Sequence, residues 1–409
     1  MKLRPISAAI ALLLTALVAP AHADDTRRPY IVQLADQPVS SYTGGIAGLA
    51  ATKPVAGSKL NLTTAAAQAY SAYLAQKQQS VKALVANAPL VYDYKVVLNG
   101  FSAMLTDDEV RALQANGNVA AVTADVAREP LTNYTPTFLG LDGAAGLWSQ
   151  LGGKANAGED IVIGIIDTGI WPENPSYADR VDANGKPTFA NSGTLAYDAP
   201  ANWQGGCQDG EGFTVAACNN KLIGARYFKD GFDSTGRELH WTEFVSPRDS
   251  LGGATGHGGH GTHTSTTAGG NNGVAANLGG AGVGDVSGMA PRARIASYKV
   301  CWTFVAPAEA SGSKNSCWGQ DSVAAIERAV IDGVNVLNFS IGGGETLADP
   351  VDQAFLHAVN AGVFVAASAG NSGPGNQVAH ISPWLAIVAA SSHDRVFGAT
   401  ATLGNGAQY

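Results

Sequence analysis

The sequence predicts an α/β protein built on a parallel, doubly wound sheet and preceded by a smaller α+β module. Three observations support this prediction. Short apolar or β-branched runs of strand length recur between residues 161 and 390. Helical periodicity lies between them, over 321–332 and 351–361, and each helix is followed by a terminating glycine. Polar residues come at the ends of several runs, where such sheets bind their ligands.

The strands of this sheet are expected in five places, all of similar length and composition: 161–166, 293–300, 334–339, 363–367 and 385–390. Parallel strands need crossover connections, and the intervening helices can supply them. Asp167, Ser340 and Asn371 then follow strand ends at one edge of the sheet.

The smaller module is expected after residue 23. Its strands are predicted at 30–34, 94–98, 101–105 and 119–123. A capping box at Thr106 and Glu109 begins a short helix. A longer helix ends near Pro89, and its apolar stripe consists of Tyr70, Leu74, Val81, Leu84 and Val85. The module contains no cluster of catalytic residue types, which favours a binding or folding role.

Residues 1–23 have the features of a secretory signal peptide. Lys2 and Arg4 precede an apolar run over 8–19, and Ala21-His22-Ala23 forms a small-x-small cleavage pattern. The run is too short to span a bilayer, and no later segment reaches 18 uninterrupted apolar residues. We therefore expect a secreted, extracellular protein with no membrane partner after signal removal.

Charge and cysteine content narrow the function classes. The chain has 25 basic and 33 acidic residues, a net charge of −8, and no dense basic run, so nucleic acid is not an expected partner. Four cysteines in an exported chain indicate two disulfides. Three connectivities are possible, and we favour the two short local loops, Cys207 with Cys218 and Cys301 with Cys317.

An acid, a base and an amide occur in an order that fits acyl transfer. Asp167 ends the run IVIGIID, His260 lies in GHGGHGTHT, and Asn371 lies in AGNSGPG. A carboxylate orients an imidazole, the imidazole deprotonates a hydroxyl, and an amide binds the oxyanion. Taken singly, each residue also has a structural interpretation: Asp167 as a turn cap, His260 as a structural histidine with its hydrogen bonds satisfied, and Asn371 as a turn residue.

Several motifs together resemble the subtilisin-like serine proteases, in particular the plant-type, cucumisin-like branch. They are IIDTGIWPENPSY, CNNKLIGARYF, GHGTHT, GMAPRARIASYKVCW, DGVNVLNFSIGG and AASAGNSGPG. YKVVLNGFSAMLTDDEVRAL resembles the inhibitory propeptide of that family. The resemblance implies a signal peptide over 1–23, a ferredoxin-like propeptide domain over 24–131 and the amino-terminal part of a subtilisin-like catalytic domain over 132–409.

The resemblance also implies roles for individual residues. Asp167 and His260 match the catalytic acid and base, Asn371 matches the oxyanion-hole amide, and His263 is structural. The walls of the primary specificity pocket fall on Ser340, Ile341 and Gly342 and on Ser368, Ala369 and Gly370. The implied partners are polypeptide substrates and the chain's own propeptide as an intramolecular inhibitor. No cofactor or catalytic metal is implied, and structural calcium is undetermined.

The chain departs from the family pattern in two places. Residues 248–259 expand the segment before the histidine motif. No Gly-Thr-Ser segment occurs in the 38 residues after Asn371, so the nucleophile motif is absent. Because losing such a nucleophile lowers kcat by about 10⁶, we expect the chain as written to be an inactive part of a secreted serine endopeptidase zymogen.

Two alternatives stay open at this point. The chain could be a non-catalytic inhibitor module or pseudoenzyme, in which 24–131 is the working part. It could also be a metal-dependent hydrolase that uses His257, His260 and His263, although helical ligand pairs more often use i, i+4 spacing. For the zymogen, we expect residues 126–132 to cross the active-site cleft and the mature chain to begin between about 127 and 136.

Overall fold

The computed structural model describes residues 27–55, 58–125, 139–189, 192–251, 258–278, 281–373, 375 and 377–390. The expected signal peptide, the propeptide end at 126–132 and His257 lie outside the described residues. The predictions made for those segments therefore stay predictions.

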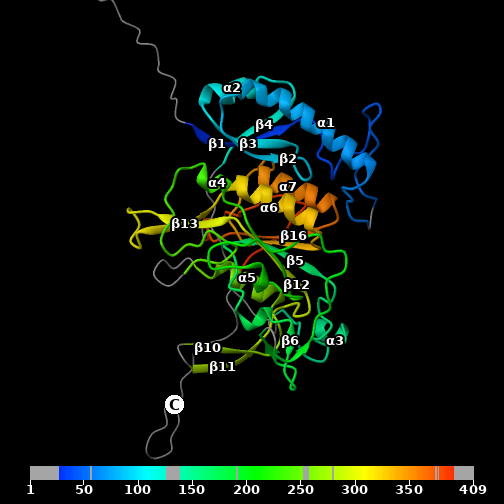
Figure 1. Ribbon diagram of the computed structural model, residues 1–409, viewed down its shortest axis with the longest axis vertical. Coiled ribbons are helices and arrows are strands. Elements are labelled where there is room, and N and C mark those ends of the chain that lie inside the picture. The colour runs from blue at the N-terminus through cyan, green and yellow to red at the C-terminus, as the bar shows by residue number, and fades with distance from the viewer. Residues whose placement is uncertain are drawn as a thin grey trace, which may run out of the picture.

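The amino-terminal unit is a four-stranded antiparallel sheet covered on one face by two helices (Figure 1). Its strands follow the order β2-β3-β1-β4, and the chain passes through them as βαββαβ, the ferredoxin-like arrangement expected. The capping box at Thr106 and Glu109 is present. The elements are β1 (Arg28–Leu34), α1 (Ala65–Lys82), β2 (Leu90–Tyr94), β3 (Gly100–Leu105), α2 (Asp107–Gln114) and β4 (Val119–Ala124).

Two details of this unit differ from the sequence prediction. The strand expected at 94–98 lies earlier, as β2, and residues 96–98 form an irregular buried segment. Their side chains join the core that the unit shares with the second unit, which explains why apolar residues continue beyond the strand. Leu84 is 46% exposed because α1 ends at Lys82 and tightens into a 3₁₀ turn, Ala83–Val85, which rotates Leu84 off the apolar stripe.

The second unit contains a parallel sheet, of six strands among the described residues, in the order β17-β16-β15-β5-β12-β9. Helices α6 and α7 cover one face, and α5 lies on the other (Figure 1), so the doubly wound prediction is confirmed. The sequence prediction missed β9. The elements are β5 (Val162–Asp167), β9 (Leu222–Tyr227), α5 (His260–Gly269), β12 (Arg294–Lys299), α6 (Gly319–Asp332), β15 (Val336–Phe339), α7 (Pro350–Asn360), β16 (Phe364–Ser368) and β17 (Ala386–Val388).

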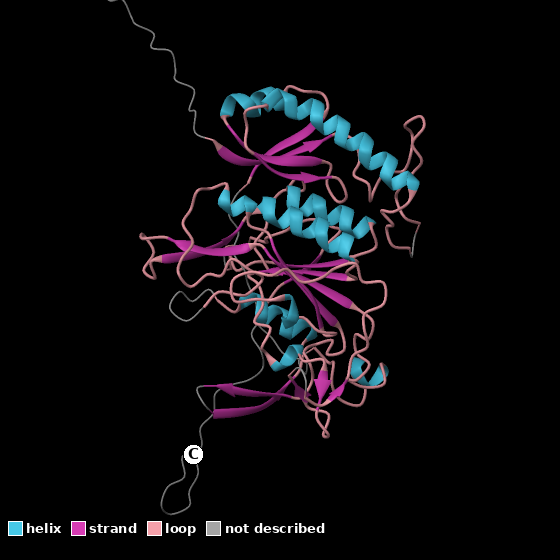
Figure 2. Cartoon of the chain, viewed as in Figure 1, coloured by secondary structure: helices cyan, strands magenta, loops and turns pink. Residues whose placement is uncertain are grey.

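The second unit also contains shorter helices and strands (Figure 2). The cysteines pair as expected: Cys301 with Cys317 closes the base of the β13–β14 hairpin, and Cys207 pairs with Cys218. These elements are α3 (Leu147–Gln150), η2 (Pro175–Tyr177), β6 (Arg180–Val181), β7 (Pro187–Thr188), β8 (Thr194–Leu195), η3 (Val215–Ala217), α4 (Asp230–Asp233), β10 (Val274–Leu278), β11 (Ala281–Val286), β13 (Cys301–Val305) and β14 (Ser313–Cys317).

The sheet of the first unit packs on α6 and α7 of the second (Figure 1). Asp125 accepts hydrogen bonds from the backbone N–H groups of Gly319 (2.7 Å) and Gln320 (2.8 Å), and so caps the amino end of α6 from outside the helix. The Glu327 carboxylate accepts from the backbone N–H of Lys95 (3.1 Å) and Val96 (3.3 Å). The two units are thus joined by polar contacts to α6 as well as by a shared apolar core.

Candidate active site

Asp167 is the last residue of β5, in the middle of the parallel sheet. It pairs in register with Lys299 of β12, and Val300 donates its N–H to the Asp167 carbonyl (2.9 Å). The side chain is buried, with 1% of the residue exposed. Pairing with β12 at Asp167 itself, and with β15 as far as Ile165, therefore fixes the backbone that carries this carboxylate.

The sheet delivers the carboxylate directly to His260. Asp167 Oδ1 lies 2.8 Å from His260 Nδ1 and accepts the Thr168 N–H at 2.7 Å, while Oδ2 accepts from Thr264 Oγ1 at 3.1 Å. A carboxylate beside Nδ1 favours the tautomer in which Nδ1 carries the proton, so Nε2 becomes the basic nitrogen. Asp167 and His260, 93 residues apart in the sequence, thus have the geometry of an orienting acid and a base.

The position of His260 depends on the glycine after it. His260 is the first residue of α5, and a Cβ at Gly261 would lie 2.3 Å from the Gly169 carbonyl oxygen and 3.2 Å from the Asp167 Cβ. No real side chain fits there, so glycine lets the helix begin against the turn that follows β5. The Gly261 N–H also donates to Thr168 Oγ1 at 2.7 Å, which links the two segments directly.

Asp249 is a site residue that the sequence analysis did not single out. It is fully buried, and its Oδ2 accepts from both the N–H (3.2 Å) and the Oγ1 (3.1 Å) of Thr262 in the first turn of α5. Burial raises the pKa of this carboxyl, and the nearby Lys299 ammonium opposes that shift. Asp249 lies in the segment 248–259 that expands the family pattern. In the sequence, only the position of Asp249 shortly before the histidine motif indicates that it caps α5.

Lys299 forms a second buried contact behind the site. Its ammonium lies 2.6 Å from Glu243 Oε1 and donates to the carbonyls of Phe244 (3.1 Å) and Arg248 (2.6 Å). Both charged side chains are essentially unexposed. Because an isolated buried charge is costly, this pair and its carbonyl partners fix the segment that carries Asp249 against β12.

His263 lies on the same helix as His260, three residues further along. Burial lowers its pKa, and the neighbouring His260 lowers it further. In the described part of the chain, no three His, Cys, Asp or Glu side chains group as metal ligands. His257 lies outside the described residues, so the three-histidine alternative remains a hypothesis about that segment.

The residues expected to form the specificity pocket lie beside Asp167. Extending the strand register by one or two residues places Ser340 next to Asp167 on one side and next to Ser368 on the other. Ser368 Oγ donates to the Ile341 carbonyl at 3.0 Å, so the two expected walls touch. Asn371 is exposed and lies beyond the end of β16. β16 is two strands from β5 in the sheet, a strand spacing of about 10 Å.

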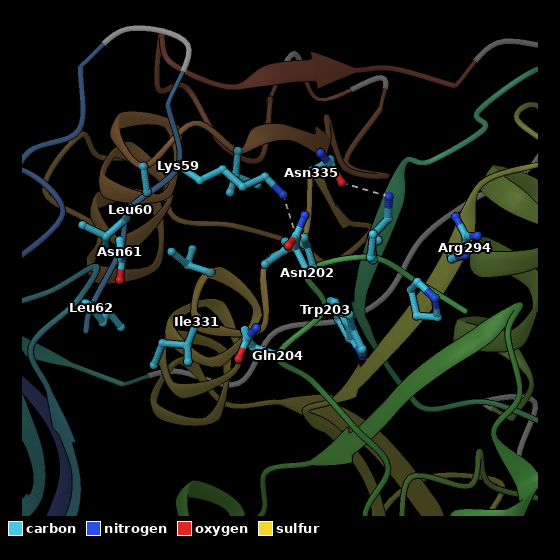
Figure 3. Close-up of a pocket in the computed structure, with 18 of the residues that line it drawn as sticks. Lys59, Leu60, Asn61, Leu62, Asn202, Trp203, Gln204, Arg294, Ile331 and Asn335 are labelled. Carbon is cyan, nitrogen blue, oxygen red and sulfur yellow. Dashed lines mark hydrogen bonds between the residues drawn. The ribbon is translucent and has the colours of Figure 1, made fainter. Parts of the chain in front are cut away.

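A cavity lies at the opposite edge of the sheet from Asp167. It encloses about 770 Å³ near the amino ends of β5 and β15, next to Asn335, whose side chain accepts the Val162 N–H at 3.0 Å (Figure 3). Lys59 of the first unit borders it and donates to the Gly333 carbonyl at 3.0 Å. Since Asp167 ends β5 at the opposite edge, this cavity is separate from the candidate active site.

Fold and site together define a class of protein. A buried acid and a histidine base meet at the carboxyl edge of a doubly wound parallel sheet, a geometry suited to hydroxyl activation in acyl transfer. The family comparison agrees: residues 158–402 match the subtilase family and residues 29–130 match the peptidase inhibitor I9 family. The chain belongs to the subtilase family and carries an amino-terminal I9 propeptide unit.

Curated relatives give the same assignment. The chain is 40% identical to subtilisin-like protease SBT1.6 of Arabidopsis thaliana over 78% of its own length and 38% of that protein. It is 36% identical to SBT2.6 of the same plant over 93% of its length and 44% of that protein. The chain therefore spans about two fifths of the length of the curated relatives that it matches.

Solved structures include fervidolysin from Fervidobacterium pennivorans, described as a keratinolytic enzyme related to subtilisin. It is 17% identical, covers 86% of this chain and 41% of its own, and gives a TM-score of 0.43. The fold assignment rests on the strand order and register described above. In the described residues, no helix has both the length and the apolar character that crossing a bilayer requires.

Proposed function

We propose that these residues are the acid–base half of the active site of a secreted serine endopeptidase, made as a zymogen. The observation that carries this proposal is the Asp167 Oδ1 to His260 Nδ1 contact of 2.8 Å at the strand edge. The carboxylate orients the imidazole and stabilises its protonated form after the imidazole has taken a proton from a serine hydroxyl. The serine is proposed to come from a segment encoded beyond residue 409.

The residues beside the pair have proposed roles in the same reaction. Asn371 donates to the oxyanion of the tetrahedral intermediate, an interaction that contributes about 2.7 to 4 kcal/mol in comparable sites. Ser340 to Gly342 and Ser368 to Gly370 bind the substrate side chain that precedes the scissile bond. Small residues at these positions support the proposal, because an extended peptide can then approach the backbone closely.

The amino-terminal unit is proposed to act as the intramolecular inhibitor. Its sheet covers α6 and α7, and Asp125 brings the chain to the amino end of α6 immediately before residues 126–132. That contact supports the expectation that the next residues enter the cleft and are cut on maturation. Amino-terminal sequencing of the secreted protein tests this proposal, and a start far from 127–136 would contradict it.

The catalytic proposal is tested with the protein that the complete coding region encodes. The nucleotide sequence is read past codon 409 for a Gly-Thr-Ser segment, and the encoded protein is assayed with a peptide library and a serine-directed phosphonate probe. We expect labelling and cleavage, with kcat reduced about 10⁴-fold by Asp167→Ala and about 10⁶-fold by His260→Ala. An intact secreted product with no cleavage and no labelling would overturn the proposal and favour the inhibitor or pseudoenzyme alternative.

A further inference from the structure

A second histidine–aspartate pair lies behind the expected specificity pocket. His380 and Asp352 are both completely buried, and their Nδ1 and Oδ1 atoms are 2.7 Å apart. Asp352 belongs to α7, while His380 lies between β16 and β17 with a left-handed φ of 65°. A non-glycine residue in that conformation carries local strain, which the surrounding contacts must offset.

The hydrogen bonds of His380 restrict where its protons lie. Nδ1 faces a carboxylate oxygen, and Nε2 lies 3.0 Å from the carbonyl oxygen of Ile341. A carbonyl can only accept, so Nε2 must carry a proton. The proton between Nδ1 and Asp352 then makes the pair neutral as a whole, whichever atom holds it. A neutral pair suits a site from which water is excluded.

Asp352 is held by further donors from the segment that carries His380. Ser382 Oγ donates to its Oδ2 at 2.7 Å, and Trp384 Nε1 donates to its backbone carbonyl at 2.8 Å. His380 therefore approaches Ile341 from a segment that is tied to α7 at three points. This makes the Nε2 donor a fixed group.

The Ile341 carbonyl is where the two expected pocket walls meet. It accepts from His380 Nε2 and also from Ser368 Oγ, each at 3.0 Å. The second wall is tied to the same segment, because Ala379 donates its N–H to the Ala369 carbonyl at 2.9 Å. Ala379 thus contacts the second wall through its backbone nitrogen, and His380 contacts the first wall through a ring nitrogen.

The ring of His380 also shapes the chain that follows the first wall. A Cβ at Gly343 would lie 2.2 Å from Cε1 and Nδ1 of this ring, so the backbone passes directly over it. Phe339, the residue before the wall, contacts the ring edge to face with centroids 5.5 Å apart. The segment 339–343 is therefore supported by the imidazole from end to end.

We propose that Asp352 and His380 form a positioning pair that fixes the Ile341 carbonyl and thereby sets the shape of the specificity pocket. The proposal rests on the proposed function, because that function makes residues 340–342 and 368–370 a specificity pocket. The contacts that hold the Ile341 carbonyl do not depend on catalysis. Neither residue is proposed to touch substrate or the reacting atoms. Their effect on the reaction passes through the two walls.

Three variants of the 409-residue chain separate positioning from simple core packing. His380→Gln keeps a nitrogen donor near the Nε2 position, and His380→Leu removes it. In Asp352→Asn the amide can donate to Nδ1 and accept from Ser382, so the Nε2 proton is retained. We expect amide exchange at residues 340–344 to rise about tenfold or more in His380→Leu and to stay near wild type in the other two variants. Amides of β12 serve as the internal reference.

Equal exchange at 340–344 in wild type and His380→Leu would overturn the proposal, as would a rise of the same size in β12. If His380→Leu does not fold, the ¹⁵N spectrum of wild-type His380 decides. A protonated Nε2 supports the proposal, and an unprotonated Nε2 contradicts it.

A kinetic test uses a form of the protein that includes the proposed serine segment. In that form, His380→Leu should change the kcat/KM ratio between substrates with large and small side chains before the scissile bond, and His380→Gln should retain it. An inactive wild type would overturn the proposed function, while the exchange data would still decide the positioning role.

Discussion

The close approach of α5 to the end of β5 requires a glycine at position 261. Gly261→Ala places a methyl group 2.3 Å from the Gly169 carbonyl oxygen, so the helix start must move. We expect the free energy of unfolding to fall by about 1 to 3 kcal/mol, measured by denaturant titration. The control is Gly117→Ala, where an added Cβ meets nothing within 4 Å. Equal effects of the two substitutions would contradict this account of the glycine.

Thr264 contributes to the site in a way that the sequence analysis did not anticipate. Thr264→Val keeps the shape but removes the donor to Asp167 Oδ2, which leaves a buried carboxylate oxygen without that bond. We expect a loss of about 1 to 3 kcal/mol in unfolding free energy. Thr266→Val is the matched control on the same helix, because Thr266 Oγ1 donates to helix carbonyls. A larger loss in the control would contradict the role given to Thr264.

At the scale of elements, Glu327 of α6 links the two units through the backbone of residues 95–96. Burial raises the pKa of this carboxyl to about 7. A raised carboxyl pKa means that the folded chain binds more protons than the unfolded chain between about pH 4.5 and 7, so Glu327 contributes stability that falls as pH rises through this window. We expect Glu327→Gln to flatten that fall in denaturant titrations at several pH values. An unchanged slope would contradict the shift.

Several elements could be predicted from the sequence because local signals and packing agree. The helices α6 and α7 have apolar periodicity and a glycine at or just after their ends, and β5 is a continuous apolar run. β9 was missed because Gly224 and Arg226 interrupt its run LIGARY, so no continuous apolar or alternating signal marks it, and pairing with β12 is what makes it a strand. The position of β2 was wrong because residues 96–98 are apolar for contact with the second unit. His380 could not be found because its partners, Asp352 and the Ile341 carbonyl, lie 28 and 39 residues away in the sequence. Asp249 gave only a weak signal, because it lies in the expanded segment before the histidine motif, 13 residues from its partner Thr262.

At the scale of the whole molecule, the two units share one core. Val96, Val97 and Leu98 of the first unit belong to the same buried cluster as residues of α6 and α7. We expect a chain that begins at residue 139 to have a lower unfolding midpoint and to bind a hydrophobic dye, because that apolar surface becomes exposed. Thermal melts with dye binding measure this. A shortened chain with the midpoint of the full chain and no added dye binding would contradict the shared core.

The proposed chemistry depends on Asp167 holding His260 through a proton on Nδ1. The most direct measurement is the ¹H–¹⁵N spectrum of the histidine-labelled 409-residue chain, which reports ring protons held in strong hydrogen bonds. We expect a downfield Nδ1 proton of His260 that disappears in Asp167→Ala and persists in His263→Gln, with both variants folded. A His260 Nδ1 proton that is absent, or that survives the loss of Asp167, would contradict it.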